Sequence, residues 1–172
     1  APRVYNRPHH IHADVTIPDG GAEGVLLTHG SRHGGYSLYV KDGRLHYVHN
    51  YLGLTRFGVT STEEVPAGRH ELRMELATTG SPSFLEGKGS PAEVRLFVDG
   101  RLVGAGRLPY TVPNNFGILG VSCGFAAYDS VEPDDYRAPF AFTGELHQVV
   151  LDVSGELTIV PEAELAQLLG EQ

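Results

Sequence analysis

Apolar and polar residues alternate with a period of two along much of the chain. In residues 11–17 every odd position is apolar and every even position is His, Asp or Thr. Residues 70–76 carry a similar pattern, in which Leu72, Met74 and Leu76 alternate with Glu71, Arg73 and Glu75. Because successive side chains of a β-strand point to opposite faces, each run predicts a strand with one buried face.

Two further segments predict β-hairpins. Residues 37–45 and 94–102 each read as a strand, an Asp-Gly pair and a second strand. Asp-Gly tolerates the positive φ angles of a two-residue hairpin turn. Other runs predict strands at residues 24–29, 36–40, 58–62 and 144–153, with a polar break at residues 30–35.

Only residues 161–169 follow a helical pattern. Pro161 suits the first position of a helix, Glu162 and Glu164 favour its N-terminal dipole, and Gly170 ends it. About a dozen short strands with one terminal helix predict an all-β fold of two antiparallel sheets packed as a sandwich. We expect residues 1–160 to form the sandwich and residues 161–172 a helical tail.

The composition indicates one globular domain and limits its partners. The 172 residues suffice for one core, and the 22 glycines and 11 prolines are spread along the chain as turn residues. A formal net charge of -8, with no run of Lys or Arg, argues against nucleic acid and acidic membrane surfaces as partners. No apolar stretch approaches the length that spans a bilayer, so we expect a soluble protein.

Six segments, taken together and in order, carry a resemblance to a known family. They cover most of the chain, at residues 17–26, 34–45, 47–50, 66–70, 96–100 and 142–146. In this series the chain resembles the C-terminal β-sandwich domain of bacterial arylsulfatases, within the concanavalin A/laminin-G-like jelly-roll group. The resemblance implies a jelly roll that packs beside a sulfatase catalytic domain, where it supports that domain, shapes the substrate entrance or mediates oligomerisation.

The parts that make sulfatases catalytic are absent from this sequence. Those enzymes carry a Cys/Ser-x-Pro-x-Arg motif, whose first residue becomes formylglycine, and a metal-binding aspartate cluster. Here Cys123 is followed by Gly-Phe-Ala-Ala, without the proline or the arginine. We therefore carry over no catalytic residue and expect this domain alone to be non-catalytic, within a parent protein that hydrolyses sulfate esters.

The single cysteine and the first residue of the sequence do not decide the cellular compartment. Cys123 is the only cysteine, so it forms no internal disulfide and builds no thiolate metal cage. The chain begins at Ala1 rather than at methionine, as we expect of a processed or truncated product. The cytoplasm and export from a bacterium both stay open.

Other catalytic classes also lack their sequence signatures. Glu63 with Glu64, or Glu145 with Asp152, offers a carboxylate pair of the glycosidase kind, but the usual Glu-x-Asp-x-x-Glu strand is missing. A Gly-x-Ser-x-Gly elbow is missing too, and residues 87–90 lack the spacing of a phosphate loop. These observations disfavour autonomous catalysis.

Residues 129–136 are a candidate calcium loop. Carboxylates and backbone carbonyls supply the oxygen ligands that calcium prefers, although the spacing is not that of an EF-hand. The candidate ligands are Asp129, Glu132, Asp134 and Asp135. The alternative is a solvated loop whose aspartates cap turns.

Histidines near the N-terminus suggest a second metal hypothesis. Residues 9–12 read His-His-Ile-His, so His10 and His12 would project from one face of a strand as two imidazole ligands. A third ligand would have to come from elsewhere. The alternative is a polar strand face.

Tyr47, His49 and Tyr51 share one face of a predicted strand and are candidate sugar-binding residues. Aromatic rings stack on sugars, although this chain has no tryptophan. The alternative is that these rings pack against the opposing sheet.

Two functions of different classes follow. The first is a non-catalytic accessory domain of an arylsulfatase-like enzyme, whose partner is the sulfatase catalytic domain or a second copy. The alternative is a free-standing, lectin-like module that binds glycans. A structural fragment without a ligand is the third possibility.

Overall fold

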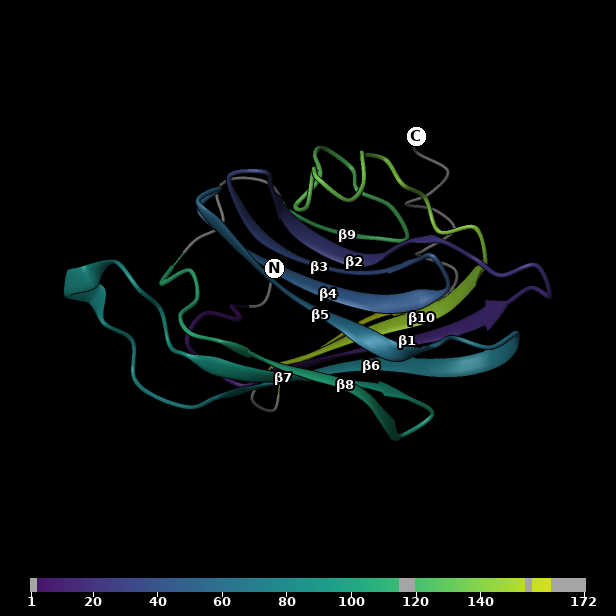
Figure 1. The fold of residues 1–172 in the computed structure, drawn as a ribbon, viewed down its shortest axis with the longest axis horizontal. Helices are drawn as coiled ribbons and strands as arrows, with labels where there is room; N and C mark the ends of the chain where they lie inside the picture. The colour runs from purple at the N-terminus through teal and green to yellow at the C-terminus, as the bar shows by residue number, and fades with distance from the viewer. Residues whose placement is uncertain (1–2, 115–119, 154–155, 162–172) are drawn as a thin grey trace.

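The computed structural model describes residues 3–114, 120–153 and 156–161, and it shows two antiparallel sheets packed face to face (Figure 1). In spatial order, the first sheet contains β11 (Glu156–Pro161), β10 (Glu145–Val153), β1 (His9–Ile17), β6 (Gly68–Thr78), β7 (Ala92–Val98) and β8 (Arg101–Leu108). The second contains β5 (Thr55–Glu64), β4 (Arg44–Tyr51), β3 (Gly34–Lys41), β2 (Gly24–Ser31) and β9 (Val121–Cys123). The predicted all-β, two-sheet antiparallel jelly-roll sandwich is confirmed.

The core forms where the alternating apolar positions of the two sheets face each other. In β1, Ile11, Ala13 and Val15 are fully buried, and the residues between them are half-buried on the outer face. Leu72 and Met74 of β6 are fully buried in the same way. Period-two patterning therefore decides which face of each strand is inside.

Both Asp-Gly pairs form the predicted hairpin turns. Asp42 and Gly43 have φ angles of 51° and 75° between β3 and β4. Asp99 and Gly100 have φ angles of 51° and 80° between β7 and β8. Positive φ at both central residues matches the twist of the antiparallel strands that the turn joins.

The predicted polar break at residues 30–35 is shorter in the structure, because β2 and β3 continue up to a turn at residues 32–33. Gly30 and Gly35 face each other in the register of these two strands. A Cβ atom on Gly35 would lie 2.0 Å from the carbonyl oxygen of His29. Two glycines therefore allow a close approach of β2 and β3 where their polar neighbours suggest a loop.

The C-terminal end differs from the prediction. Pro161, expected to begin a helix, is the last residue of β11, which pairs antiparallel with β10. The remaining positions of the predicted helix, 162–169, lie outside the described residues. Within the described ranges the only helical turn is η1 (Phe84–Glu86), and no helix there is long and apolar enough to cross a membrane.

A long loop covers the outer face of the five-stranded sheet. This covering loop, residues 124–144, connects β9 to β10 and rises above β2 and β3 in Figure 1. It is packed through a second apolar cluster, formed by Val25, Tyr39, Val48, Ala126 and Tyr136, with Phe140 against it. The cluster fixes the polar residues that the covering loop carries.

Candidate functional site

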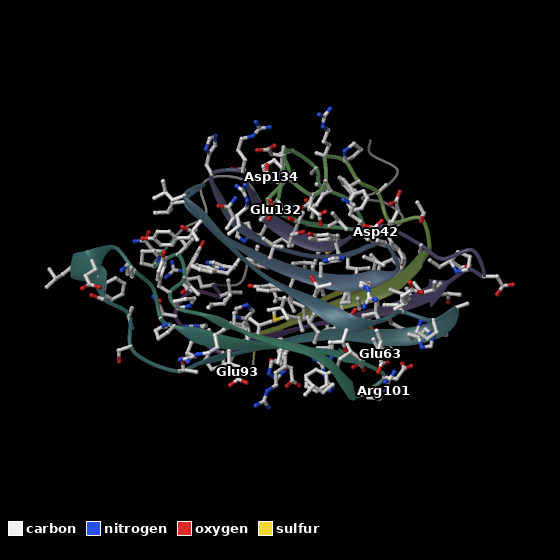
Figure 2. All side chains as sticks on the ribbon, viewed as in Figure 1. Asp42, Glu63, Glu93, Arg101, Glu132 and Asp134 are labelled. Atoms are coloured by element: carbon white, nitrogen blue, oxygen red, sulfur yellow. The ribbon has the colours of Figure 1, made fainter. Side chains whose placement is uncertain are left out.

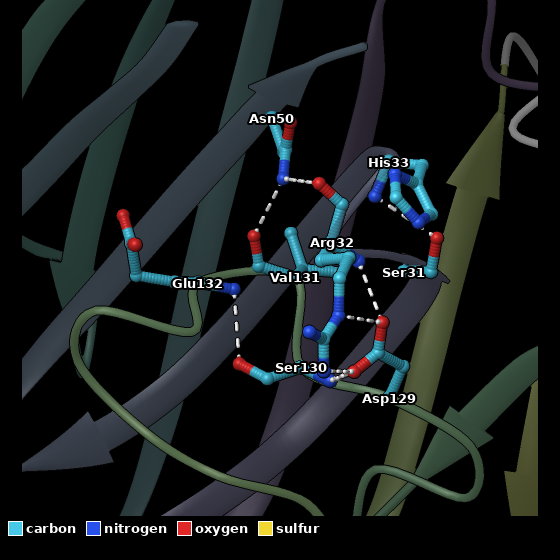
Figure 3. A network of polar contacts seen from close by, with 8 residues as sticks. All are labelled: Ser31, Arg32, His33, Asn50, Asp129, Ser130, Val131 and Glu132. Carbon is cyan, nitrogen blue, oxygen red and sulfur yellow. Dashed lines mark hydrogen bonds and ion pairs between the residues drawn. The ribbon is translucent and has the colours of Figure 1, made fainter. Parts of the chain in front are cut away.

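The acidic segment of the sequence lies on the covering loop, and its first carboxylate is held by an arginine. Arg32, in the turn between β2 and β3, donates from Nε to Asp129 Oδ2 at 3.0 Å and from Nη2 to Asp129 Oδ1 at 3.1 Å (Figure 3). The backbone N–H of Arg32 also donates to Oδ2, at 3.0 Å. These hydrogen bonds lower the pKa of Asp129 to about 2, so the carboxylate stays ionised at neutral pH.

The other three acidic side chains also face basic residues of the sheet. Glu132 Oε1 lies 2.8 Å from Arg56 Nε, and Asp134 pairs with the other end of the same guanidinium. Asp135 Oδ1 lies 2.7 Å from Lys41 Nζ. Figure 2 shows Glu132 and Asp134 on the covering loop above the sheet.

The structure does not bring the four predicted calcium ligands together. Arg32, Arg56 and Lys41 come from different strands or turns, and Arg56 serves two of the carboxylates while the other two cations serve one each. In the described part of the chain, no group of three or more His, Cys, Asp and Glu side chains is arranged to hold a metal ion. The physical reason is that three basic side chains hold the four carboxylates at different places along the loop.

The histidine pair lies on the outer face of the six-stranded sheet. The ring centroids of His10 and His12 are 6.1 Å apart. His12 Nδ1 lies 3.7 Å from Glu71 Oε1. The described residues supply no third ligand that would complete a site.

Tyr47, His49 and Tyr51 point into the core of the sandwich, as in the packing alternative. All three side chains are buried, so they offer no exposed ring face to a sugar. His49 Nε2 accepts a hydrogen bond from the Val112 N–H at 3.1 Å, and the Tyr51 hydroxyl donates to the Gly87 carbonyl at 2.5 Å. Burial lowers the pKa of His49 to about 3 and keeps it neutral.

The carboxylate pairs considered for a glycosidase do not face each other across a cleft. Glu63 on β5 accepts from Arg101 on β8 at 2.5 Å, where the edges of the two sheets meet (Figure 2). Glu145 and Asp152 lie near opposite ends of β10. Cys123 is buried, and burial raises the pKa of its thiol to about 12, so it is a poor nucleophile.

An open depression lies instead where the covering loop meets the turn between β2 and β3. We call it the rim site and define it by Arg32, Tyr128, Asp129, Ser130 and Arg137, which line it. Tyr128 is 67% exposed, and Arg137 is exposed as well. The Arg32–Asp129 pair forms one wall with fixed hydrogen-bonding groups.

A buried asparagine holds the two parts of the rim site together. Asn50 of β4 is fully buried, and its Nδ2 donates to the Arg32 carbonyl at 3.0 Å and to the Val131 carbonyl at 2.8 Å (Figure 3). One amide therefore joins the β2–β3 turn to the covering loop. Asn50 has no local signal in the sequence, because its partner Val131 is 81 positions away.

The rim site combines an exposed aromatic ring with groups that donate and accept hydrogen bonds. A phenol ring can stack on the apolar face of a ring-shaped ligand. Guanidinium, carboxylate and hydroxyl groups can bond the polar edge of that ligand. Since Asp129 is ionised and paired, it suits acceptance of a hydrogen bond rather than general acid catalysis.

Comparisons with known proteins show the fold. No protein-family model matches the sequence, and no curated protein matches it. Domains LG4-5 of the mouse laminin alpha1 chain match over 92% of this chain, with 19% identity and a TM-score of 0.62. The receptor-binding domain of botulinum neurotoxin type G matches over 94%, with 8% identity and a TM-score of 0.53.

This chain spans only 39% and 37% of the lengths of those two proteins. The comparisons provide no link to arylsulfatases. At these identities the likeness is one of architecture, and the chain folds as a laminin-G-like β-sandwich.

Proposed function

We propose that this chain is a non-catalytic binding domain whose rim site recognises carbohydrate. The observation that carries the proposal is the 67% exposed ring of Tyr128 beside the paired Arg32 and Asp129 in one surface depression. Other large side chains of this chain are as exposed, such as Phe84, so the placement of Tyr128 beside a paired Arg and Asp in a depression is what supports the proposal. A receptor-binding domain among the structural neighbours agrees with a binding role.

The chemistry of the rim site matches that of a sugar. A pyranose ring has an apolar C–H face, which stacks on a phenol, and a belt of hydroxyls, which both donate and accept. Arg32 and Asp129 are already fixed by bidentate hydrogen bonds, and Asn50 fixes the turn that carries Arg32. Because these side chains are ordered before binding, less binding free energy is lost in ordering them when the ligand binds.

Binding to a glycan array, followed by calorimetry on the best sugar, tests the proposal. Tyr128→Ala and Arg137→Ala are each expected to weaken binding by roughly tenfold, which corresponds to about 1.4 kcal/mol. Leu102→Ala is the matched control, because this exposed side chain lies on β8 in the other sheet. Folded protein that binds no sugar, or equal affinity of Tyr128→Ala and the native chain, would overturn the proposal.

An accessory role beside a sulfatase catalytic domain is the narrower form of this function, and it rests on the sequence resemblance alone. It predicts that the chain binds such a catalytic domain added separately. Co-sedimentation of the two is the test, and their independent sedimentation at micromolar concentration would remove this form while leaving the sugar site intact.

A further inference from the structure

A small internal cavity lies between the two sheets. The N-terminal segment before β1 and the end of the loop between β6 and β7 close it from the side. About 20 Å³ of the cavity is open to the centre of a water-sized sphere. That is enough for one water molecule, which needs roughly 10–15 Å³ on this measure. His9 of β1 and Tyr47 of β4 line it from opposite sheets.

The hydrogen bonding of His9 fixes which of its nitrogens carries the proton. His9 Nδ1 lies 3.1 Å from the carbonyl oxygen of Arg7. Because a carbonyl only accepts, Nδ1 must carry the hydrogen, and Nε2 of the neutral ring then presents a lone pair. His9 Nε2 is buried and has no hydrogen-bond partner among the described residues.

Tyr47 presents the complementary group. Its ring is fully buried in the core, and its hydroxyl has no hydrogen-bond partner in the described part of the chain. A buried hydroxyl without a hydrogen bond destabilises the fold, and so does a buried ring nitrogen without one. Two such groups lining one cavity are a reason to look for a molecule that satisfies both.

We propose that this cavity binds one water molecule, which donates to His9 Nε2 and accepts from the Tyr47 hydroxyl. The water links β1 to β4 and so connects the two sheets through polar contacts inside the apolar core. Its second hydrogen is offered to Thr111, which lines the same cavity. Thr111 Oγ1 donates its hydrogen to the Ser90 carbonyl at 2.8 Å, so its lone pairs can accept a hydrogen bond from the water.

The charge state of the cavity favours a neutral ligand over an ion. Burial lowers the pKa of His9 to about 4, so the imidazole is uncharged at neutral pH. Burial raises the pKa of Tyr47, so the phenol is uncharged as well. A buried ion without a counter-charge would be costly here, whereas water is small, neutral and able to donate and accept at once.

A crystal structure at a resolution that shows ordered waters is the direct test. We expect density for one water within hydrogen-bond distance of both His9 Nε2 and the Tyr47 hydroxyl. A cavity without density there overturns the proposal. So does a direct hydrogen bond between the two side chains, or a nitrogen-15 spectrum that shows the hydrogen of His9 on Nε2.

A double-mutant cycle provides the second test. Tyr47→Phe removes the hydroxyl and is expected to lower the folding equilibrium constant roughly tenfold. The double variant Tyr47→Phe with His9→Phe should lower the folding equilibrium constant by less than the product of the two single decreases. The difference should be roughly threefold or more, because one water bonds both side chains. Tyr51→Phe is the control: its hydroxyl bonds Gly87 outside the cavity, so its effect should multiply with that of His9→Phe.

Multiplying effects of Tyr47→Phe and His9→Phe would contradict the shared water. If His9→Phe does not fold, the crystal structure of Tyr47→Phe decides instead. The proposal then predicts that the water is lost or moved from its place in the native chain. An unchanged water position in that variant would overturn it.

Discussion

His9 and His49 are buried, uncharged imidazoles. The stability of the chain in mild acid tests this burial. Burial lowers the pKa of His9 to about 4 and that of His49 to about 3. In the unfolded chain a histidine titrates near its ordinary pKa of about 6.5. Acidification from neutral pH should therefore favour the unfolded chain.

The size of the effect follows from proton linkage. As the pH falls below about 6.5, the unfolded chain binds two protons that the native chain excludes, so the free energy of unfolding falls. At pH 5 each histidine removes about 2 kcal/mol of stability, and together they remove about 4 kcal/mol. The loss levels off only when the pH passes below the folded pKa values. Since small domains are stable by about 5–15 kcal/mol, this loss is easily measured.

Other groups with shifted pKa values either change the stability little between pH 7.5 and 5 or oppose the loss caused by His9 and His49. Burial opposes the charge on His70, but hydrogen bonds to Asp99 and to backbone outweigh it and raise the pKa. The stability from His70 is thus fully present below pH 6.5 and is lost as the pH rises through its folded pKa. The lowered pKa of Asp129 costs stability only below about pH 4, outside the window.

Urea unfolding at several pH values between 7.5 and 5, followed by far-UV circular dichroism, measures the loss. The native chain should lose about 2.7 kcal/mol per pH unit near the acid end, which corresponds to two protons. His49→Gln keeps an acceptor for the Val112 N–H but does not titrate, so its slope should fall to about 1.4 kcal/mol per pH unit. His33→Gln, at an exposed position, is the control and should keep the native slope. A flat profile, or a native slope in His49→Gln, would refute the reasoning.

Three further outcomes are expected. An NMR titration should place the pKa of His70 above about 6.5 and Asp99→Asn should lower it, because Asp99 Oδ2 lies 2.6 Å from His70 Nδ1; no change would contradict the pairing. The melting temperature of the chain should be the same with calcium as with a chelator, because the carboxylates of residues 129–136 already face basic side chains. A clear rise with calcium would restore the calcium hypothesis. Gly35→Ala should destabilise the chain by at least about 3 kcal/mol in urea unfolding, because its Cβ would meet the His29 carbonyl; a loss below 1 kcal/mol, on the order of an ordinary surface change, would contradict that contact.

The sandwich could be predicted because its information is local. Alternation places the side chains of residues 11–17 on the correct faces, and the same period places His9 inside, in line with Ile11. Asp-Gly pairs determine two turns by their φ preferences alone. Residues 157–160 read Leu-Thr-Ile-Val, so β11 also carries a local strand signal, which the prediction of a helix from Pro161 onward left unused.

The rim site could not be predicted, because its two sides are far apart in the sequence. Arg32 and Asp129 are 97 positions apart, and only the packing of the covering loop over the sheet brings them together. The sequence does mark residues 129–136 as unusual through their charge. It does not show that the basic partners come from the β2–β3 turn, from β3 and from β5, in the sheet beneath the covering loop.

The basic partners of the covering loop also bear on which ligand fits the proposed sugar site. Four carboxylates of this loop face Arg32, Arg56 and Lys41, and Arg137 adds a fourth positive charge at the same surface. The covering loop and its partners are therefore close to electrically neutral on a chain whose net charge is -8, whereas the rim site itself holds two arginines and one carboxylate. A cation gains little from the rim site, because Arg32 and Arg137 outnumber Asp129 there. A ligand with many hydroxyls suits the proposed site, because the paired side chains hold their donors and acceptors in place and Tyr128 adds an uncovered ring.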